Sequence, residues 1–157
     1  ADLTTATLTN MADNPRQLLF TTGGGTPADA PANAVITGKG PGGLELSETL
    51  ALSQSAAAVT SVHFYNEITS IVYPAADGTD ATVAIGIGAK LGISRTPKLR
   101  TGKIAVLGEL EDGAAVGTAG TYEAASASIA PYGAYTPNSA LDGALDFALY
   151  YEFAPTA

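Results

Sequence analysis

Apolar residues at every second position are the feature of this sequence that most constrains its fold. In the segment 145–153, one face carries Leu145, Phe147, Leu149, Tyr151 and Phe153, and the other carries Asp146, Ala148, Tyr150 and Glu152. The same period recurs over 44–52 and 82–87. A period of two is typical of a β-strand with one face on a core. The Ala-rich stretches 54–58 and 124–130 do not sustain a helical period, so we predict an all-β protein.

Turn residues divide these strands into short pieces. Turns are indicated at Gly38–Gly43, at Asp77-Gly78 and at 111–113, where Gly, Pro and Asp gather. Short strands separated by such turns are typical of a β-sandwich or barrel. We therefore expect residues 34–157 to form a β-sandwich, either a plain one or a jelly-roll-like one. The stretch 68–73 is apolar on both faces, which predicts a buried central strand.

Residues 1–33 are predicted to lie outside the sandwich. The segment 1–10 places Leu3 and Leu8 among threonines, which is compatible with an extended arm. The segment 21–33 holds three consecutive glycines and two prolines, a composition typical of a flexible linker. We expect an extended N-terminal arm whose apolar side chains contact a partner, namely Leu3, Leu8, Met11, Leu18, Leu19 and Phe20.

Composition and charge exclude several classes of protein. The chain has no cysteine, so it has no disulfide scaffold, cysteine zinc site or thiol nucleophile. Fifteen acidic residues against seven basic ones give a net charge of −8, which argues against a nucleic-acid partner. No apolar run is long enough to span a membrane. The segment 1–20 lacks the basic start and apolar stretch of a signal peptide.

Candidate chemical residues do not form a recognisable catalytic or metal pattern. His63 is the only histidine, and it occupies an outward-facing position of an alternating strand. Asp77 and Asp80 share one turn, but the third acidic position and distal Glu of an EF-hand loop are missing. Glu109 and the pair Glu111-Asp112 are read as a solvated turn. We predict no catalytic residue, no metal and no cofactor, and hence a protein that is not an enzyme.

Two further clusters are candidates for binding. Five of the seven basic residues fall close together, at Lys90, Arg95, Lys98, Arg100 and Lys103. This segment is either a solvated loop or a surface that docks on an acidic partner, and Arg95, Lys98 and Arg100 are its candidate contact residues.

Five of the seven tyrosines gather near the end of the chain, at Tyr122, Tyr132, Tyr135, Tyr150 and Tyr151. Tyr offers a large contact area and is enriched at interfaces. We expect most of these rings to pack within the sandwich. A protein interface and a sugar-binding groove are the alternatives.

Three segments carry a resemblance to a known group of proteins. They read AVITGKGPGGLELSETLALS (34–53), VTSVHFYNEITSIVYPAADGTDATVAIGIGAKLGI (59–93) and YTPNSALDGALDFALYYEFAP (135–155). An ITG strand followed by an ETL strand, an ITSI strand, an IG.G.KLG strand and a closing ALDG…D.A.YYE strand make up the shared motifs. In these motifs the chain resembles small virion structural proteins of tailed bacteriophages, most of all capsid decoration (cement) proteins.

The resemblance implies a non-enzymatic virion protein on the outer surface of the capsid. Proteins of that group bind the major capsid protein and reinforce the head lattice by bridging its subunits. Copies of the chain itself are implied as further partners, as a dimer or trimer at a lattice symmetry axis. Two alternatives remain: a phage tail component (tube, adaptor or tip protein), and a carbohydrate-binding module that stacks sugars on Tyr132 and Tyr135.

Overall fold

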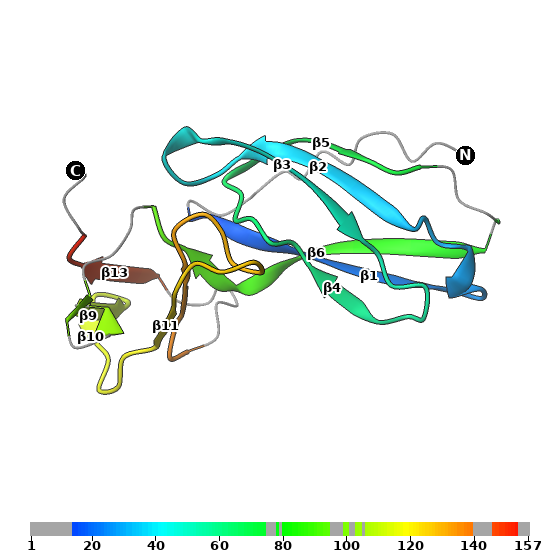
Figure 1. The fold of residues 1–157 in the computed structure, drawn as a ribbon. Helices are drawn as coiled ribbons and strands as arrows, with labels where there is room; N and C mark the ends of the chain where they lie inside the picture. Colours follow the sequence, from blue (N-terminus) through cyan, green and yellow to red (C-terminus); the bar gives the residue numbers. More distant parts are fainter. Residues whose placement is uncertain are drawn as a thin grey trace.

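Antiparallel strands make up most of the computed structural model, which describes residues 14–74, 78, 80–94, 99–100, 103–104, 106–139 and 146–153 (Figure 1). Its elements are β1 (Arg16–Gly24), η1 (Pro27–Asp29), β2 (Asn33–Lys39), η2 (Pro41–Gly43), β3 (Glu45–Ala51), β4 (Ala58–Thr60), β5 (Glu67–Val72), β6 (Ala81–Gly92), β7 (Leu99–Arg100), β8 (Lys103–Ile104), β9 (Val106–Glu111), β10 (Ala114–Ala115), β11 (Thr121–Glu123), β12 (Ala134–Thr136) and β13 (Phe147–Tyr151). The predicted all-β, sandwich-like fold is confirmed.

Two sheets form the layers of the sandwich. One has the strand order β11-β12-β6-β1-β4, and the other, with the order β3-β2-β5, lies over its β1–β6 part (Figure 1). The core between them contains Leu18 and Phe20 from β1, Ile36 from β2, Ile71 from β5 and Tyr65, none of which is exposed. Burial of each such side chain contributes about 1.5–3 kcal/mol. The alternation of the strands therefore builds the core as the sequence predicts.

The prediction of an N-terminal arm is wrong from Arg16 onward. β1 lies inside the five-stranded sheet, between β6 and β4, and its register runs from Arg16 opposite Leu91 to Gly24 opposite Ala81. Two of the expected contact residues, Leu18 and Phe20, are core residues. The alternating pattern does not indicate this strand, because the glycines at its end supply no side chains to the pattern. Their backbone can nevertheless pair in a ladder.

The Gly- and Pro-rich stretch after β1 is also tied to the domain. The carbonyls of Ala28 and Ala30 accept hydrogen bonds from the Gln54 side-chain amide at 3.2 and 3.1 Å. The amide of Thr26 donates to the Asp80 carbonyl at 3.2 Å. These bonds hold the backbone without a hydrophobic cluster, so composition alone indicated a linker where the structure has a bonded turn.

The position predicted for the strand 68–73 is also wrong. This strand is β5, and it lies at the edge of its sheet, beside β2. Ile71 is fully buried, but Val72 is 57 % exposed. Apolar residues on both faces predict burial on both sides, whereas here the outward face of an edge strand carries the exposed Val72.

A third sheet, with the order β10-β9-β13, forms one end of the molecule, at the left in Figure 1. Asp112 and Gly113 join β9 to β10, with φ values of 50° and 78°. A two-residue hairpin turn requires a positive φ at both of its residues, and Asp-Gly adopts such angles readily. This turn was predicted correctly. β13 pairs with β9 from Phe147 opposite Glu111 to Tyr151 opposite Val106.

Candidate functional site

The residues predicted to contact a partner do not form one surface among those described. Leu18 and Phe20 are buried, and of the three apolar arm residues that the structure describes only Leu19, which is half-buried, points away from the core. Leu3, Leu8, Met11, Arg95 and Lys98 lie outside the described residues. Arg100 belongs to β7. Lys90, at the start of the basic segment, is paired with Glu123 at 2.7 Å, so it is neutralised within the fold.

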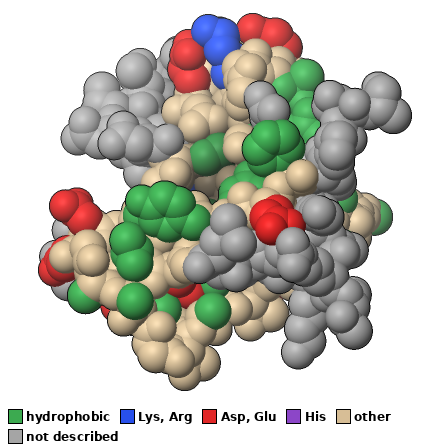
Figure 2. All heavy atoms as spheres, turned by 90° about the vertical axis from the view of Figure 1, so that its left-hand side faces the viewer, with side chains coloured by type: hydrophobic (Ala, Val, Ile, Leu, Met, Phe, Trp, Pro, Cys, Tyr) green, Lys and Arg blue, Asp and Glu red, His purple; other side chains and the backbone are tan. Residues whose placement is uncertain are grey.

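A cleft of about 520 Å³ lies between β13 and the end of the sandwich. Its lining residues are Asn14, Pro15, Pro41, Gly42, Asn66, Leu91, Gly92, Ile93, Ser94, Tyr135 and all of Phe147–Tyr151. Figure 2 shows this end of the molecule, where hydrophobic side chains gather around a hollow. The volume is within the ordinary range of ligand-binding clefts.

The cleft runs along the edge of β13. All five residues of this strand line it, although successive side chains of a strand point to opposite faces of the sheet. A hollow that touches every residue in turn must therefore follow the backbone. β13 is the last strand of its sheet, and no other described strand pairs with its second edge. β9 occupies the other edge of β13, and no described residue of β9 lines the cleft, so the cleft lies on the side of β13 away from β9.

None of the described residues that line the cleft carries a charge, in a chain of net charge −8. Its polar groups are amides and hydroxyls. The hydroxyls of Ser94 and Tyr151 are hydrogen-bonded to each other at 3.2 Å, and Asn14 and Asn66 lie at its wall. Such a lining favours an uncharged occupant with apolar side chains and hydrogen-bonding groups.

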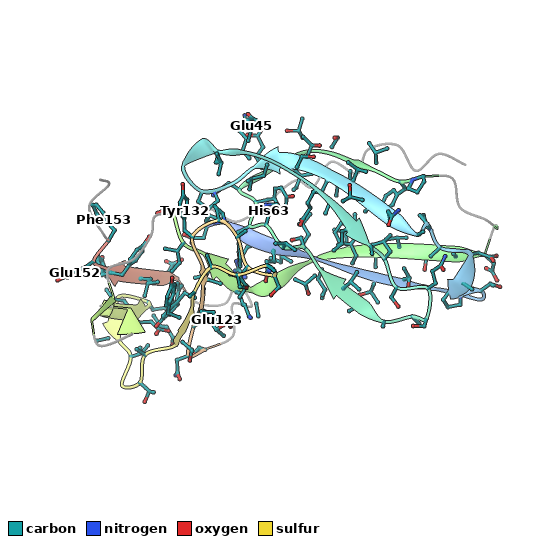
Figure 3. The ribbon with its side chains drawn as sticks, viewed as in Figure 1. Glu45, His63, Glu123, Tyr132, Glu152 and Phe153 are labelled. Carbon is teal, nitrogen blue, oxygen red and sulfur yellow. The ribbon has the colours of Figure 1, made fainter. Side chains whose placement is uncertain are left out.

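The tyrosines divide into packed and exposed rings. Tyr135 is fully buried, so the predicted pair of Tyr132 and Tyr135 cannot form a stacking platform. The Tyr122 hydroxyl donates to the Tyr132 carbonyl at 3.3 Å. Tyr150 is 55 % exposed and lines the cleft. Figure 3 shows Glu152 and Phe153 following β13 at the end of the molecule, far from His63.

Glu109 joins the third sheet to the five-stranded sheet. Its carboxylate, on β9, accepts hydrogen bonds from the Tyr135 hydroxyl (2.6 Å), the Gly120 amide (2.6 Å) and the Asn138 amide (2.9 Å). Burial alone would raise the pKa of Glu109, but these three donors outweigh it and hold the pKa below its ordinary value. The expected solvated turn is wrong here, because Glu109 is only 3 % exposed.

A second buried carboxylate, Glu48, explains a break in the apolar pattern of β3. Glu48 accepts a hydrogen bond from the Val62 amide at 2.9 Å and one from the Tyr65 hydroxyl at 3.2 Å. His63 Nδ1 lies 3.4 Å from Glu48 Oε2, the carboxylate oxygen that also accepts from the Val62 amide. Burial and the neighbouring Glu48 raise the pKa of Tyr65 far above its ordinary value, so its hydroxyl stays a donor. The histidine predicted at the surface thus packs on this pair.

Replacing Glu48 with Ala is expected to cost about 2–3 kcal/mol of unfolding free energy, because two buried donors lose their acceptor. Replacing Tyr65 with Phe removes one of those donors and is expected to cost about 1 kcal/mol. Urea unfolding of both single variants and of the double variant measures the coupling between them. Additive costs would show that the hydroxyl and the carboxylate do not act together.

Neither a metal site nor a membrane helix is found in the described ranges. Those residues include no group of three or more His, Asp or Glu side chains that could hold a metal ion. They also include no helix long and apolar enough to cross a membrane. Asp77 of the candidate calcium turn lies outside the described residues. Comparisons with family models, with curated proteins and with solved structures found no match to this chain.

Proposed function

We propose that this chain is a non-enzymatic virion structural protein that binds the outside of a phage head lattice and bridges major capsid protein subunits. The resemblance noted in the sequence supports this role. Its motifs fall on β2, β3, β5, β6 and β13, so they describe the strands of the fold and not a chemical site. A protein that bridges capsid subunits needs a surface that can contact them, and the sandwich has a candidate for that surface.

An uncharged patch on the outer face of the five-stranded sheet is the observation that carries the proposal. Leu19 lies opposite Thr60 and Gly86, and its neighbour on the same face, Thr21, lies opposite Ala58 and Ala84. Residues directly paired across strands share a face of the sheet. We call these six residues the flat face: Leu19, Thr21, Ala58, Thr60, Ala84 and Gly86.

The composition of the flat face suits the centre of an interface. Its six residues are uncharged, and five of them are small, so another surface can approach the backbone closely. Charged residues are depleted at the centres of protein interfaces in the same way. One such patch is smaller than a standard interface. A symmetric lattice multiplies weak contacts through avidity, so a cement protein does not need a large patch on each copy.

Replacing Ala84 with Glu is expected to lower binding to expanded phage heads at least about tenfold, because it buries an unpaired charge at the centre of the contact. Ala51→Glu is the matched control, since Ala51 is an exposed alanine on β3 in the other layer. Both changes add one negative charge to the whole protein. Co-sedimentation with heads that lack the protein measures the number of bound copies per capsid.

Three results of this experiment test the capsid role and the flat face as its contact surface. Saturable binding of the unmodified protein in a fixed ratio to capsid subunits, lost in Ala84→Glu and kept in Ala51→Glu, supports both the role and the face. Equal binding of all three proteins overturns the flat face as the contact. Failure of the unmodified protein to bind heads overturns the capsid role, and isolated tails are then the next sample.

A further inference from the structure

One edge of β13 pairs with no other described strand, so another strand can add to it. An edge strand exposes a row of unpaired N–H and C=O groups, which is a template for pairing with another chain. In this molecule the edge of β13 that no other described strand pairs with lies beside a cleft, and all five β13 residues line that cleft. Adding an extended segment to such an edge is a known mode of peptide recognition, in which flanking hollows receive alternate side chains.

The far wall of the cleft sets the chemistry of the added segment. Outside β13 the lining includes three apolar residues that are themselves mostly buried, Leu91 of β6, Ile93 just after it and Pro41 of η2. Tyr150 stands 55 % exposed on the strand itself. Because no charged residue is among the described lining, the segment should be uncharged and carry apolar side chains separated by small or polar ones.

The chain contains one such segment shortly before two residues of the cleft. Asn14 and Pro15 line the cleft, so residues 1–13 are joined to the domain at its wall. Residues 3–11 read LTTATLTNM, with no charged side chain. Thr is β-branched and favours strands, and Leu3, Leu8 and Met11 supply the apolar groups.

We propose that residues 3–11 of one copy add as a strand, in a second copy, to the edge of β13 that no other described strand pairs with. Thirteen extended residues reach at most about 45 Å, whereas a domain of this length has a radius of gyration of about 15 Å. The segment is therefore long enough to reach a neighbouring molecule.

The exchange fixes the kind of assembly that can form. Two copies that exchange segments reciprocally form a closed dimer, and copies that pass segments in one direction form a ring if the rotation closes. This inference goes beyond the capsid role, because it joins copies of the chain whether or not a head is present. Its failure would leave binding through the flat face untouched.

The direct test uses the protein without residues 1–13 and a synthetic peptide of sequence ADLTTATLTNMAD as the probe. Fluorescence anisotropy is expected to show saturable binding. Tyr150→Glu should weaken it at least tenfold, whereas Val72→Glu, the same change at an exposed apolar residue on the outer face of β5, should leave it within twofold. Equal effects of the two variants, or no binding of the peptide, would overturn the proposal.

A proline variant of the peptide tests whether the contact is made by the backbone. Proline at Thr7 removes an N–H from the middle of the segment and cannot take part fully in a ladder. We expect at least tenfold weaker binding than for the natural peptide. A proline peptide that binds equally well would show that side chains alone hold the segment, which contradicts strand addition.

The oligomeric state separates exchange between copies from folding back within one copy. Analytical ultracentrifugation of the full chain is expected to show dimers or larger closed species that dissociate on dilution, and the truncated protein should sediment as a monomer. A full chain that stays monomeric at all concentrations while the peptide binds its truncated form would place the segment in its own cleft and overturn the exchange. Head binding by the truncated protein is measured in parallel and reports on the capsid role alone.

Discussion

Deleting residues 1–20 is expected to unfold the protein, whereas deleting residues 1–13 is expected to leave the domain folded. The longer deletion removes the first half of β1, which pairs with β6 and β4 on its two sides. It also removes Leu18 and Phe20, two fully buried core side chains. Loss of a large core side chain alone costs about 3–5 kcal/mol, and the whole domain is stabilised by only about 5–15 kcal/mol.

Circular dichroism and thermal unfolding of the two truncated proteins measure this difference. The protein that begins at Asn14 should keep the strand signal and a cooperative transition, and the protein that begins at Thr21 should show neither. A pair of point variants serves as the matched control within β1. Phe20→Ala should cost about 3–5 kcal/mol, and Leu19→Ala, next to it on the outer face, about 1 kcal/mol. Equal costs at both positions would contradict the assignment of the two faces.

This result determines how any role of the N-terminal segment can be studied. A deletion that extends into β1 removes binding by removing the fold, so loss of capsid binding would then say nothing about an arm. Ending the deletion at Asp13 keeps every residue of β1. Only that protein can separate the contribution of residues 1–13 from the contribution of the flat face.

The alternation of side chains predicted most strands correctly, because a period of two reports directly on a half-buried face. The segment 44–52 is an example: Leu46 of β3 and Leu52 just after it are buried as predicted, and Glu48 interrupts the pattern because Val62 and Tyr65 supply donors to it. The Asp112-Gly113 turn was also predictable, since its residue types match the backbone angles that a tight hairpin requires. Local patterns therefore predict the strands and the turns between them.

Pairing between distant segments could not be predicted from the same patterns. β1 pairs with β6, far along the chain, and its glycines give no signal of that contact. The cleft combines residues from both ends of the chain, such as Asn14 and Tyr150, with Pro41 between them. Glu109 was misread for the same reason, because its donors Tyr135, Gly120 and Asn138 lie later in the sequence and reach it only in the folded state. The period of apolar residues and the local composition indicate that a segment is a strand, but they do not show which other strands it pairs with.

Acid is expected to weaken the joint between the third sheet and the sandwich through Glu109. The pKa of Glu109 is lower in the folded protein than in the unfolded chain, so the folded state favours the ionised carboxylate. Its contribution to stability is fully present at pH values above the ordinary carboxyl pKa of the unfolded chain. That contribution is lost as the pH falls through the lowered pKa of the folded state.

Replacing Glu109 with Gln should remove both the stabilisation and its dependence on pH. At neutral pH we expect a loss of about 2–3 kcal/mol, because Tyr135 and two backbone amides lose a charged acceptor. Urea unfolding from pH 7 down to pH 3 should therefore show a shallower decline for Glu109→Gln than for the unmodified protein. Glu45→Gln, the same chemical change at an exposed position at the start of β3, controls for the altered net charge. Parallel pH profiles for Glu109→Gln and the unmodified protein would show that the ionised carboxylate of Glu109 does not hold the two sheets together.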